Sequence, residues 1–295
     1  EEMNYQLTAR IQRKMPEFSK GQRLIANYIE EHYDEVAFMT AAKLGATVGV
    51  SESTVVRFAT EIGYAGYPEL QRAMQEMIRS RMTSVQRLEM TEKSCPSDQI
   101  LSAVLNRDID IIRRTIEETS HEMFYEAVDA IVSAKKIYII GVRSSHALAS
   151  FMAYYFNLLF ENVQMVNATS EAEIFEQMIH VDEHDAVIGI SFPRYSKRAV
   201  KALKFASSRG AKVVAITDSV LSPLADPAEF LLLARSEMAS FVDSLVAPLS
   251  LINALIVASA IKKKDEVKDV FHSLETIWDE YGVYEKVDEK PGESV

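Results

Sequence analysis

Hydroxyl side chains gather directly after two apolar segments that read as buried β-strands. Ser144 and Ser145 follow the first segment, and Ser191 and Ser196 follow the second. In a parallel sheet, ligands bind beyond the carboxyl ends of the strands. Free backbone N–H groups at a following helix, together with hydroxyls, form a site for an anion such as phosphate. Each serine taken alone also fits an ordinary helix cap.

Two arginines stand inside the same loops. Arg143 precedes the first serine pair and Arg194 lies between the serines of the second loop. A guanidinium group can hold a phosphate or carboxylate by two parallel hydrogen bonds, so we expect these residues to clamp the anion or a second acidic group. The alternative is that each arginine forms a structural salt bridge or fills a site that has lost its ligand.

A different chemistry is indicated by Thr40–Tyr64, TAAKLGATVGVSESTVVRFATEIGY. Apolar residues at helical spacing on both sides of Gly49 predict two short helices joined by a tight turn, the helix-turn-helix arrangement. Ser51 is a suitable N-cap for the second helix, whose positive end would lie near a DNA phosphate. The residues predicted to contact DNA are Ser51, Ser53, Thr54 and Arg57, with Lys43 as a further phosphate contact. A helical hairpin without a DNA role remains the alternative.

Acid–base catalysis and metal binding have little support in the sequence. His146, Glu171, Glu173 and His180 lie near predicted strand ends, but the pattern brings no pair of them together. We therefore predict no catalytic residues. The sequence has no HExxH motif, no paired cysteines, no calcium-binding loop, no Walker loop and no GxGxxG motif, so neither a metal nor a cofactor is expected.

The composition is that of a globular protein and limits the partners. The 295 residues include 48% hydrophobic and 25% charged residues and carry a net charge of −11. Residues 1–90 hold 11 Lys/Arg against 12 Asp/Glu, so any DNA-binding face must arise from local clustering. The single cysteine, Cys95, cannot form an intrachain disulfide. We expect a cytoplasmic protein, because no secretory signal is visible and the apolar run 245–261 reads as a core helix rather than a membrane span.

The order of the elements predicts two domains. Residues 1–82 read as an all-α helix-turn-helix domain, 83–104 as a linker and the start of a connecting helix, 105–285 as an α/β domain, and 286–295 as a flexible tail. Five apolar strands alternate with helices in the α/β domain, which predicts a five-stranded parallel sheet covered by helices. The strands are predicted at 137–141, 163–166, 186–191, 213–217 and 230–233.

The N-terminal segment resembles the helix-turn-helix domain of the RpiR family of bacterial regulators. The run GVSESTVVRF followed by GYAGYPEL carries this resemblance, which covers about residues 6–82. The C-terminal half, about 105–282, resembles the sugar isomerase (SIS) domain. The first SIS loop, Gly-x-Gly-x-Ser, corresponds to Gly141, Arg143 and Ser145. The second, Ser-x-Ser-Gly-x-Thr/Ser, corresponds to Ser191, Pro193, Arg194 and Ser196.

The resemblance implies that the serines hold a sugar phosphate and that the N-terminal domain binds double-stranded operator DNA. It further implies a regulator of carbohydrate catabolism genes. We expect a homodimer or homotetramer, because one helix-turn-helix would bind weakly and a palindrome offers two half-sites. The late helices could supply the interface through Leu249, Ile252, Leu255, Ile256 and Ile277. The alternative for each of these residues is that it only covers the sheet. The alternatives are a sugar-phosphate isomerase and a SIS-type regulatory interaction protein.

Overall fold

The computed structural model describes residues 7, 10–81, 83–94, 97–167, 170–220, 222–236 and 242–285. The predicted tail, 286–295, and Cys95 lie outside the described residues. The chain forms two compact units, Glu1–Ser97 and Asp98–Val295.

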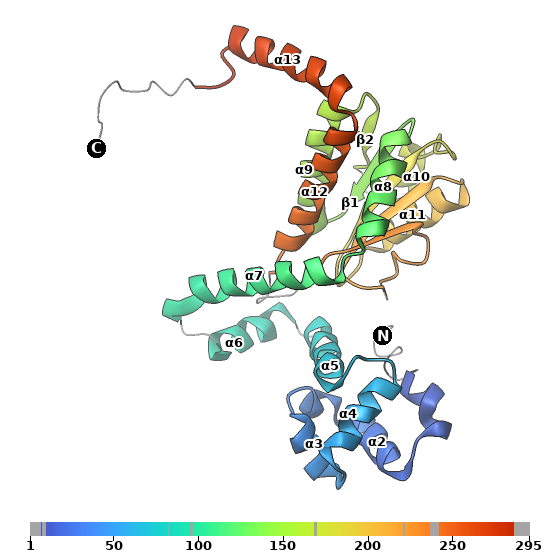
Figure 1. The fold of residues 1–295 in the computed structure, drawn as a ribbon, viewed down its shortest axis with the longest axis vertical. Coiled ribbons are helices and arrows are strands. Elements are labelled where there is room, and N and C mark those ends of the chain that lie inside the picture. The colour runs from blue at the N-terminus through green and yellow to red at the C-terminus, as the bar shows by residue number, and fades with distance from the viewer. Residues whose placement is uncertain are drawn as a thin grey trace. The chain divides into compact units, whose positions relative to one another are not determined.

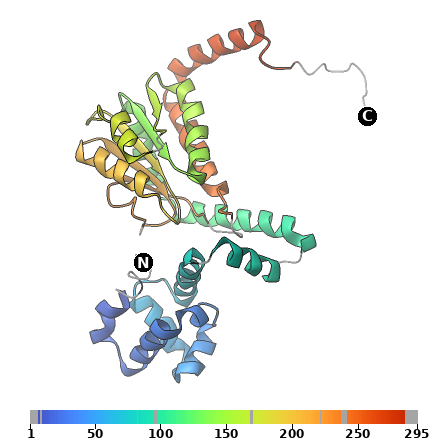
Figure 2. The same cartoon turned by 180° about the vertical axis from the view of Figure 1, so that it is seen from behind.

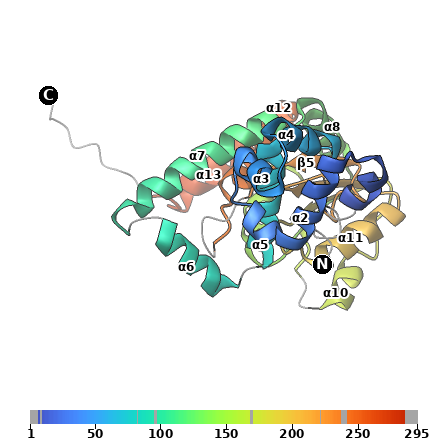
Figure 3. The same cartoon turned by 90° about the horizontal axis from the view of Figure 1, so that it is seen from below.

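The first unit is helical, as predicted. Its helices are α2 (Lys20–Val36), α3 (Ala41–Val48), α4 (Glu52–Glu61), α5 (Tyr67–Arg81) and α6 (Ser84–Ser94), with a 3-10 turn at Met15–Glu17. Figure 3 shows α2 to α5 gathered as one cluster. Residues 84–94, which are part of the linker that the sequence predicts, form α6.

One apolar core holds these helices together. Phe58 of α4 is fully buried and its ring lies 5.2 Å from that of Phe18. The fully buried core residues around them include Ile25, Ile29, Leu44, Val55, Leu70 and Met74. Because α2, α3, α4 and α5 all contribute, the geometry of the α3–α4 pair depends on the whole unit.

Three side chains of α5 bind the carbonyl groups at the end of α2. The Tyr67 hydroxyl donates to the carbonyl oxygens of Met39 (2.9 Å) and Val36 (3.3 Å). Gln71 donates to Met39 and Gln75 donates to Ala37. These bonds satisfy carbonyls that a helix end leaves without partners, and they fix the segment that leads into α3.

The second unit is an α/β domain with a five-stranded parallel sheet of order β2-β1-β3-β4-β5. Its strands are β1 (Ile137–Gly141), β2 (Val163–Met165), β3 (Ala186–Ile190), β4 (Lys212–Thr217) and β5 (Phe230–Leu233). Its helices are α7 (Ile100–Glu118), α8 (His121–Ser133), α9 (Ser144–Leu159), α10 (Glu171–Gln177), α11 (Lys197–Ser208), α12 (Val246–Lys262) and α13 (Lys264–Glu280), and a 3-10 turn spans Ser97–Gln99.

Two apolar layers cover the sheet. Helices α8, α9 and α12 pack on one face, and α10 and α11 pack on the other (Figures 1 and 2). Alternate residues of one strand face the two layers: Ile137 and Ile139 belong to the first, Tyr138 and Ile140 to the second. The continuous apolar strands of the sequence reflect this burial on both faces.

The late helices divide between core and surface. Ile252 and Leu255 of α12 are fully buried in the core, so the expectation that they supply an interface is wrong. Leu249 and Ile256 are partly buried against the same core, whereas Ile277 of α13 is exposed. Among the described residues, no single helix is long and apolar enough to span a membrane. Only the pair α12 and α13 meets that test, taken together across a bend of 101°.

Tyr67→Phe tests the attachment of α5 to the end of α2. Losing the hydrogen bonds to Met39 and Val36 should cost about 1 kcal/mol of unfolding free energy. Burial raises the pKa of Tyr67 from 10.0 to about 12. The neutral hydroxyl is therefore favoured in the folded state, and its stabilising contribution is complete below pH 10 and falls as pH rises toward 12. Urea unfolding at pH 8 and pH 11 should show the wild type losing more stability than the variant. Equal losses would contradict this role.

Candidate functional site

The turn between α3 and α4 has the backbone of a helix-turn-helix. Gly49 ends α3 in the left-handed region, with φ 76° and ψ 34°. A Cβ atom on Gly45 would lie 2.8 Å from the carbonyl oxygen of Val50, closer than a real contact. Gly45 therefore lets the turn pass directly against α3, and the backbone N–H of Val50 donates to the Gly45 carbonyl at 2.8 Å.

Three of the residues predicted to contact DNA lie together at the N-terminus of α4. The Ser51 Oγ accepts a hydrogen bond from the backbone N–H of Thr54 and so caps the helix. The same oxygen lies 2.9 Å from Ser53 Oγ and 2.8 Å from Thr54 Oγ1. Ser51 and Ser53 are exposed, while Thr54 is half-buried. The structure thus brings these three residues together at the positive end of the helix dipole.

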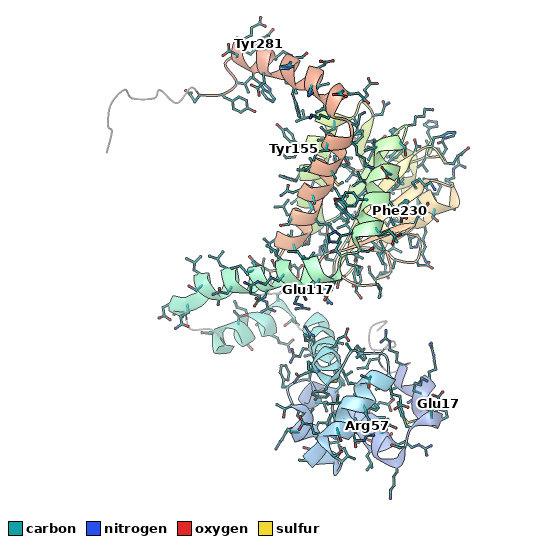
Figure 4. All side chains as sticks on the ribbon, in the orientation of Figure 1. Glu17, Arg57, Glu117, Tyr155, Phe230 and Tyr281 are labelled. Carbon is teal, nitrogen blue, oxygen red and sulfur yellow. The ribbon has the colours of Figure 1, made fainter. Side chains whose placement is uncertain are left out.

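The outward face of α4 carries Arg57 and one residue that the sequence prediction missed. Arg57 is exposed on α4 (Figure 4), and its Nε donates to the Ser53 carbonyl at 3.3 Å. Val56 is 40% exposed beside it, and its methyl groups can contact a thymine methyl. Helical spacing could have found it, because Val55 faces the core and Val56 is turned away by about 100°. The fifth predicted residue, Lys43, is exposed on α3.

The first serine loop leaves β1 at Gly141. A Cβ atom there would lie 2.4 Å from the carbonyl oxygen of Ser145, so only glycine permits α9 to begin this close to the strand. Ser144 is exposed at the first position of α9, and Ser145 is 4% exposed. The pairing of β1 with β3 places Gly141 opposite Ile190, so the two serine loops leave neighbouring strands at one edge of the sheet.

The second loop is held by its own serines. The Ser191 Oγ accepts from the backbone N–H of Ser196 at 3.0 Å, and the Ser196 Oγ accepts from the N–H of Ala199, which caps α11. A hydroxyl that accepts a hydrogen bond still has its own hydrogen to donate. The capping role of these serines is therefore compatible with donating to a bound anion.

A hydrogen bond from Tyr195 connects the same loop to Asp218, which follows β4. The Tyr195 hydroxyl donates to Asp218 Oδ1 at 2.8 Å, and the Thr217 hydroxyl donates to the same oxygen at 3.3 Å. Burial raises the pKa of Asp218, while the hydrogen bond from Tyr195 acts in the opposite direction. Asp218 thus serves as an internal anchor for the loop that carries Arg194.

Both loop arginines adopt backbone conformations that favour glycine. Arg143 has φ 60° and ψ −125°, and Arg194 has φ 65°; they are the only non-glycine residues with positive φ in the described part of the chain. Both are exposed. Within the described ranges, neither guanidinium has a hydrogen-bond or ion-pair partner, which argues against a structural salt bridge.

A cavity of about 410 Å³ opens beside the first loop. It is lined by Arg143 and His146, together with residues of β1, of the segment that follows β2, and of α10. Of the predicted effector-binding residues, Arg143 lines this cavity, whereas Ser144, Ser145, Ser191, Arg194 and Ser196 do not.

The acidic residues considered for acid–base catalysis have other partners. Glu171 forms an ion pair with Lys201 at 2.6 Å, and the hydrogen bond from Lys201 lowers the pKa of Glu171. Glu173 accepts from the backbone N–H of Ser170 and completes a capping box. His180 is exposed and does not line the cavity. No cluster of three or more metal-ligating side chains occurs among the residues that the structure describes.

These features define a class of protein, a helix-turn-helix unit followed by a sugar-isomerase-type α/β unit. Residues 5–81 match the helix-turn-helix domain of the rpiR family, and residues 130–258 match the SIS domain. The chain therefore combines an rpiR-family helix-turn-helix domain with a SIS domain.

Individual relatives agree with this assignment. An uncharacterised HTH-type transcriptional regulator of Caldanaerobacter subterraneus is 26% identical over 85% of this chain and 89% of its own length. The sugar isomerase domain of an RpiR transcription factor from Sphaerobacter thermophilus matches 60% of this chain and 99% of that domain, with 26% identity and a TM-score of 0.58. The Vibrio vulnificus NanR protein, complexed with ManNAc-6P, shares the fold over 92% of this chain and 97% of its own, with 23% identity and a TM-score of 0.54.

Arg143→Gly tests the backbone strain at the first loop. Glycine adopts positive φ without the steric cost that a side chain adds, so the substitution should raise the unfolding free energy of the ligand-free protein by about 1 kcal/mol. Ser144→Gly is the matched control, because Ser144 is helical and glycine there should destabilise the protein. Urea unfolding of both variants measures the difference, and an Arg143→Gly variant less stable than the wild type would rule out the strain.

Proposed function

We propose that this chain is a DNA-binding transcriptional regulator whose operator affinity is controlled by a phosphorylated sugar or a related anionic sugar metabolite. One observation carries the proposal: a serine-capped helix with an outward arginine and a pair of exposed loop arginines at positive φ, close in sequence to serine hydroxyls, occur in one chain. The predicted domain limits fit this proposal, because residues 1–82 would bind DNA and residues 105–285 would bind the effector. The target genes we propose are those of carbohydrate catabolism, in a bacterial cytoplasm.

Ser51, Ser53, Thr54, Arg57 and Lys43 would make the DNA contacts. Ser51 and Ser53 lie at the start of α4, where hydroxyls and the helix dipole suit a phosphate, and the exposed Arg57 can reach a guanine edge. Val56 adds an apolar contact beside Arg57.

Ser144, Ser145, Ser191 and Ser196 would hold the effector's phosphate, and Arg143 and Arg194 would clamp the phosphate or a second acidic group. The parallel pairing of β1 with β3 supports this assignment, because both loops open at the same edge of the sheet. The complex of NanR with ManNAc-6P supports a phosphosugar as the ligand class. The effector can change DNA affinity only by as much as it distinguishes two arrangements of the protein.

Our hypothesis is that the protein regulates transcription without catalysing a reaction. Isomerisation of a sugar needs an acid and a base at the sugar carbons. Glu171 is paired with Lys201, and Glu173 accepts from the backbone N–H of Ser170, so both candidate carboxylates already have partners. Turnover of an aldose or ketose phosphate by the purified chain would favour the isomerase alternative instead.

A homodimer would bring two helix-turn-helix units to a palindromic operator. The surface that we propose for the dimer contact is an exposed apolar face of the second unit. Its residues are Tyr155 (Figure 4) and Tyr154 of α9, Val257 and Ile261 of α12, and Phe271 and Ile277 of α13. Exposed apolar side chains gathered on neighbouring helices are typical of an interface.

Arg57→Ala tests the DNA-binding assignment. Duplexes selected from a random library by the purified wild type serve as the probe, and fluorescence anisotropy measures affinity at several salt concentrations. If Arg57 makes a bidentate base contact, its loss should weaken binding by about 1–3 kcal/mol. Binding of the wild type should fall steeply with salt, as counterion release requires.

Arg113→Ala is the control for net charge, because Arg113 is an exposed arginine of the second unit. It should bind the selected duplex as the wild type does. Wild-type affinity in Arg57→Ala would reject the role of Arg57, and failure to select any duplex would reject DNA binding altogether.

The double substitution Val257→Asp and Ile261→Asp tests the dimer face. Carboxylates at positions that are 56% and 67% exposed should leave the fold intact but oppose burial at an interface. Sedimentation equilibrium should show a dimer for the wild type and a monomer for the variant. Val220→Asp, at an equally exposed position in a loop, is the control and should remain dimeric. A variant that stays dimeric would place the interface elsewhere.

A further inference from the structure

The cavity of about 410 Å³ lies at the carboxyl ends of β1 and β2, on the side of β1 away from β3. Its walls are apolar, and its polar groups are three side chains. The apolar residues are Ile140, Val142, Val166 and Ile174, and the polar ones are Arg143, His146 and Asn167. A backbone contact completes the lining at Gly141.

No carboxylate occurs among the described residues that line this cavity, and each of its polar side chains can donate a hydrogen bond. Arg143 offers up to five N–H groups and no acceptor, and both His146 and Asn167 can donate. The acids in the first turn of α10 have other partners: Glu171 pairs with Lys201, and Glu173 accepts a hydrogen bond from the backbone N–H of Ser170. Within the described part of the chain, Arg143 is therefore the one charged side chain that lines the cavity.

The backbone around the cavity is fixed. The backbone N–H of Asn167 donates to Gln177 Oε1 at 3.1 Å, and Gln177 Nε2 donates to the Asn167 carbonyl at 2.6 Å. On the opposite wall, the His146 N–H donates to the carbonyl of Arg143 at 3.0 Å. The donor side chains thus start from two anchored segments, which limits the entropy lost when they bind a ligand.

This cavity and the second serine loop are distinct positions on either side of β1. β2 and β3 both pair with β1, so the ends of these two strands are about 10 Å apart. That distance suits the two ends of one pentose- or hexose-sized chain. The loop of Gly141–Ser145 stands between them and borders both.

From this arrangement we propose that the cavity receives a second anionic group, a carboxylate, and that the effector is a phosphorylated sugar acid. The phosphate binds the serine loops and the carboxylate binds Arg143, His146 and Asn167. The guanidinium of Arg143 can hold a carboxylate by two parallel charge-assisted hydrogen bonds, and His146 and Asn167 can each donate a further bond, whereas a neutral sugar hydroxyl forms no charge-assisted pair of this kind. The inference rests on the proposed function, because it assumes that the serine loops hold a phosphate.

Matched pairs of ligands test the proposal on the full-length protein. The pairs are glucose 6-phosphate with 6-phosphogluconate, ribose 5-phosphate with 5-phosphoribonate, and erythrose 4-phosphate with 4-phosphoerythronate. Each pair has one carbon skeleton and differs in the carboxylate. Isothermal titration should show that in at least one pair the acid binds at least about 10-fold more tightly, the effect of one desolvated charge-assisted contact.

Arg143→Gln should reduce that preference to less than about 3-fold, because glutamine keeps most of the side-chain length but loses the charge. Arg194→Gln is the matched control: Arg194 also has positive φ but does not line the cavity. It should weaken both members of a pair alike and leave their ratio unchanged.

The proposal is overturned if no acid binds more tightly than its aldose phosphate, or if the preference survives in Arg143→Gln. The second result would place the carboxylate elsewhere. Failure of the proposed function is recognised separately, by a protein that binds no selected DNA or whose DNA affinity no member of the panel changes. If aldose phosphates bind and change the DNA affinity while the acids do not, the proposed function stands. Only the sugar-acid ligand is then rejected.

Discussion

The parallel pairing of β1 with β3 is the constraint on which the candidate effector site depends. It sets Gly141 opposite Ile190, so that two loops far apart in the sequence open side by side. The pairing requires both strands to be buried on both faces, which their unbroken apolar residues achieve. Gly141 then lets α9 start within contact distance of its own strand. A shift of one residue in this register would turn every side chain of β1 to the other layer and separate the serine loops.

The order of elements and the class of fold were predictable from the sequence for physical reasons. Apolar runs of four to six residues between helical segments leave few arrangements other than a covered parallel sheet. The helix-turn-helix was equally accessible, because Gly49 and the Ser51 cap are local signals that act within a few residues. Helix α6 was missed because its residues have a weak apolar periodicity, so no face of Ser84–Ser94 marks it as a helix.

The parts of the site that depend on long-range contacts were not predictable. Ile252, Leu255 and Ile277 are all apolar residues of the late helices, and the sequence does not distinguish them. Tertiary packing buries the first two in the core and leaves the third exposed. It also groups Arg143 with Arg194, whereas the arrangement of β2 and α10 puts only Arg143 against the cavity. The pairing of Glu171 with Lys201 joins residues thirty positions apart and removes a carboxylate that the sequence left as a candidate.

The two arginines at positive φ connect the energetics of the fold to ligand binding. A side chain in this region costs on the order of 1–3 kcal/mol, a large share of the 5–15 kcal/mol that stabilises a typical domain. Glycine would satisfy the same backbone without that cost, and the guanidinium groups form no bond that offsets it among the described residues. A bound anion supplies such a bond.

The free energy that couples an effector to a second site is typically 1–3 kcal/mol, the same size as the strain. Since the strain falls in the loop that borders both the cavity and the serine hydroxyls, an anion that holds Arg143 stabilises one conformation of this loop over others. Ligand binding and loop conformation are then coupled through a single residue.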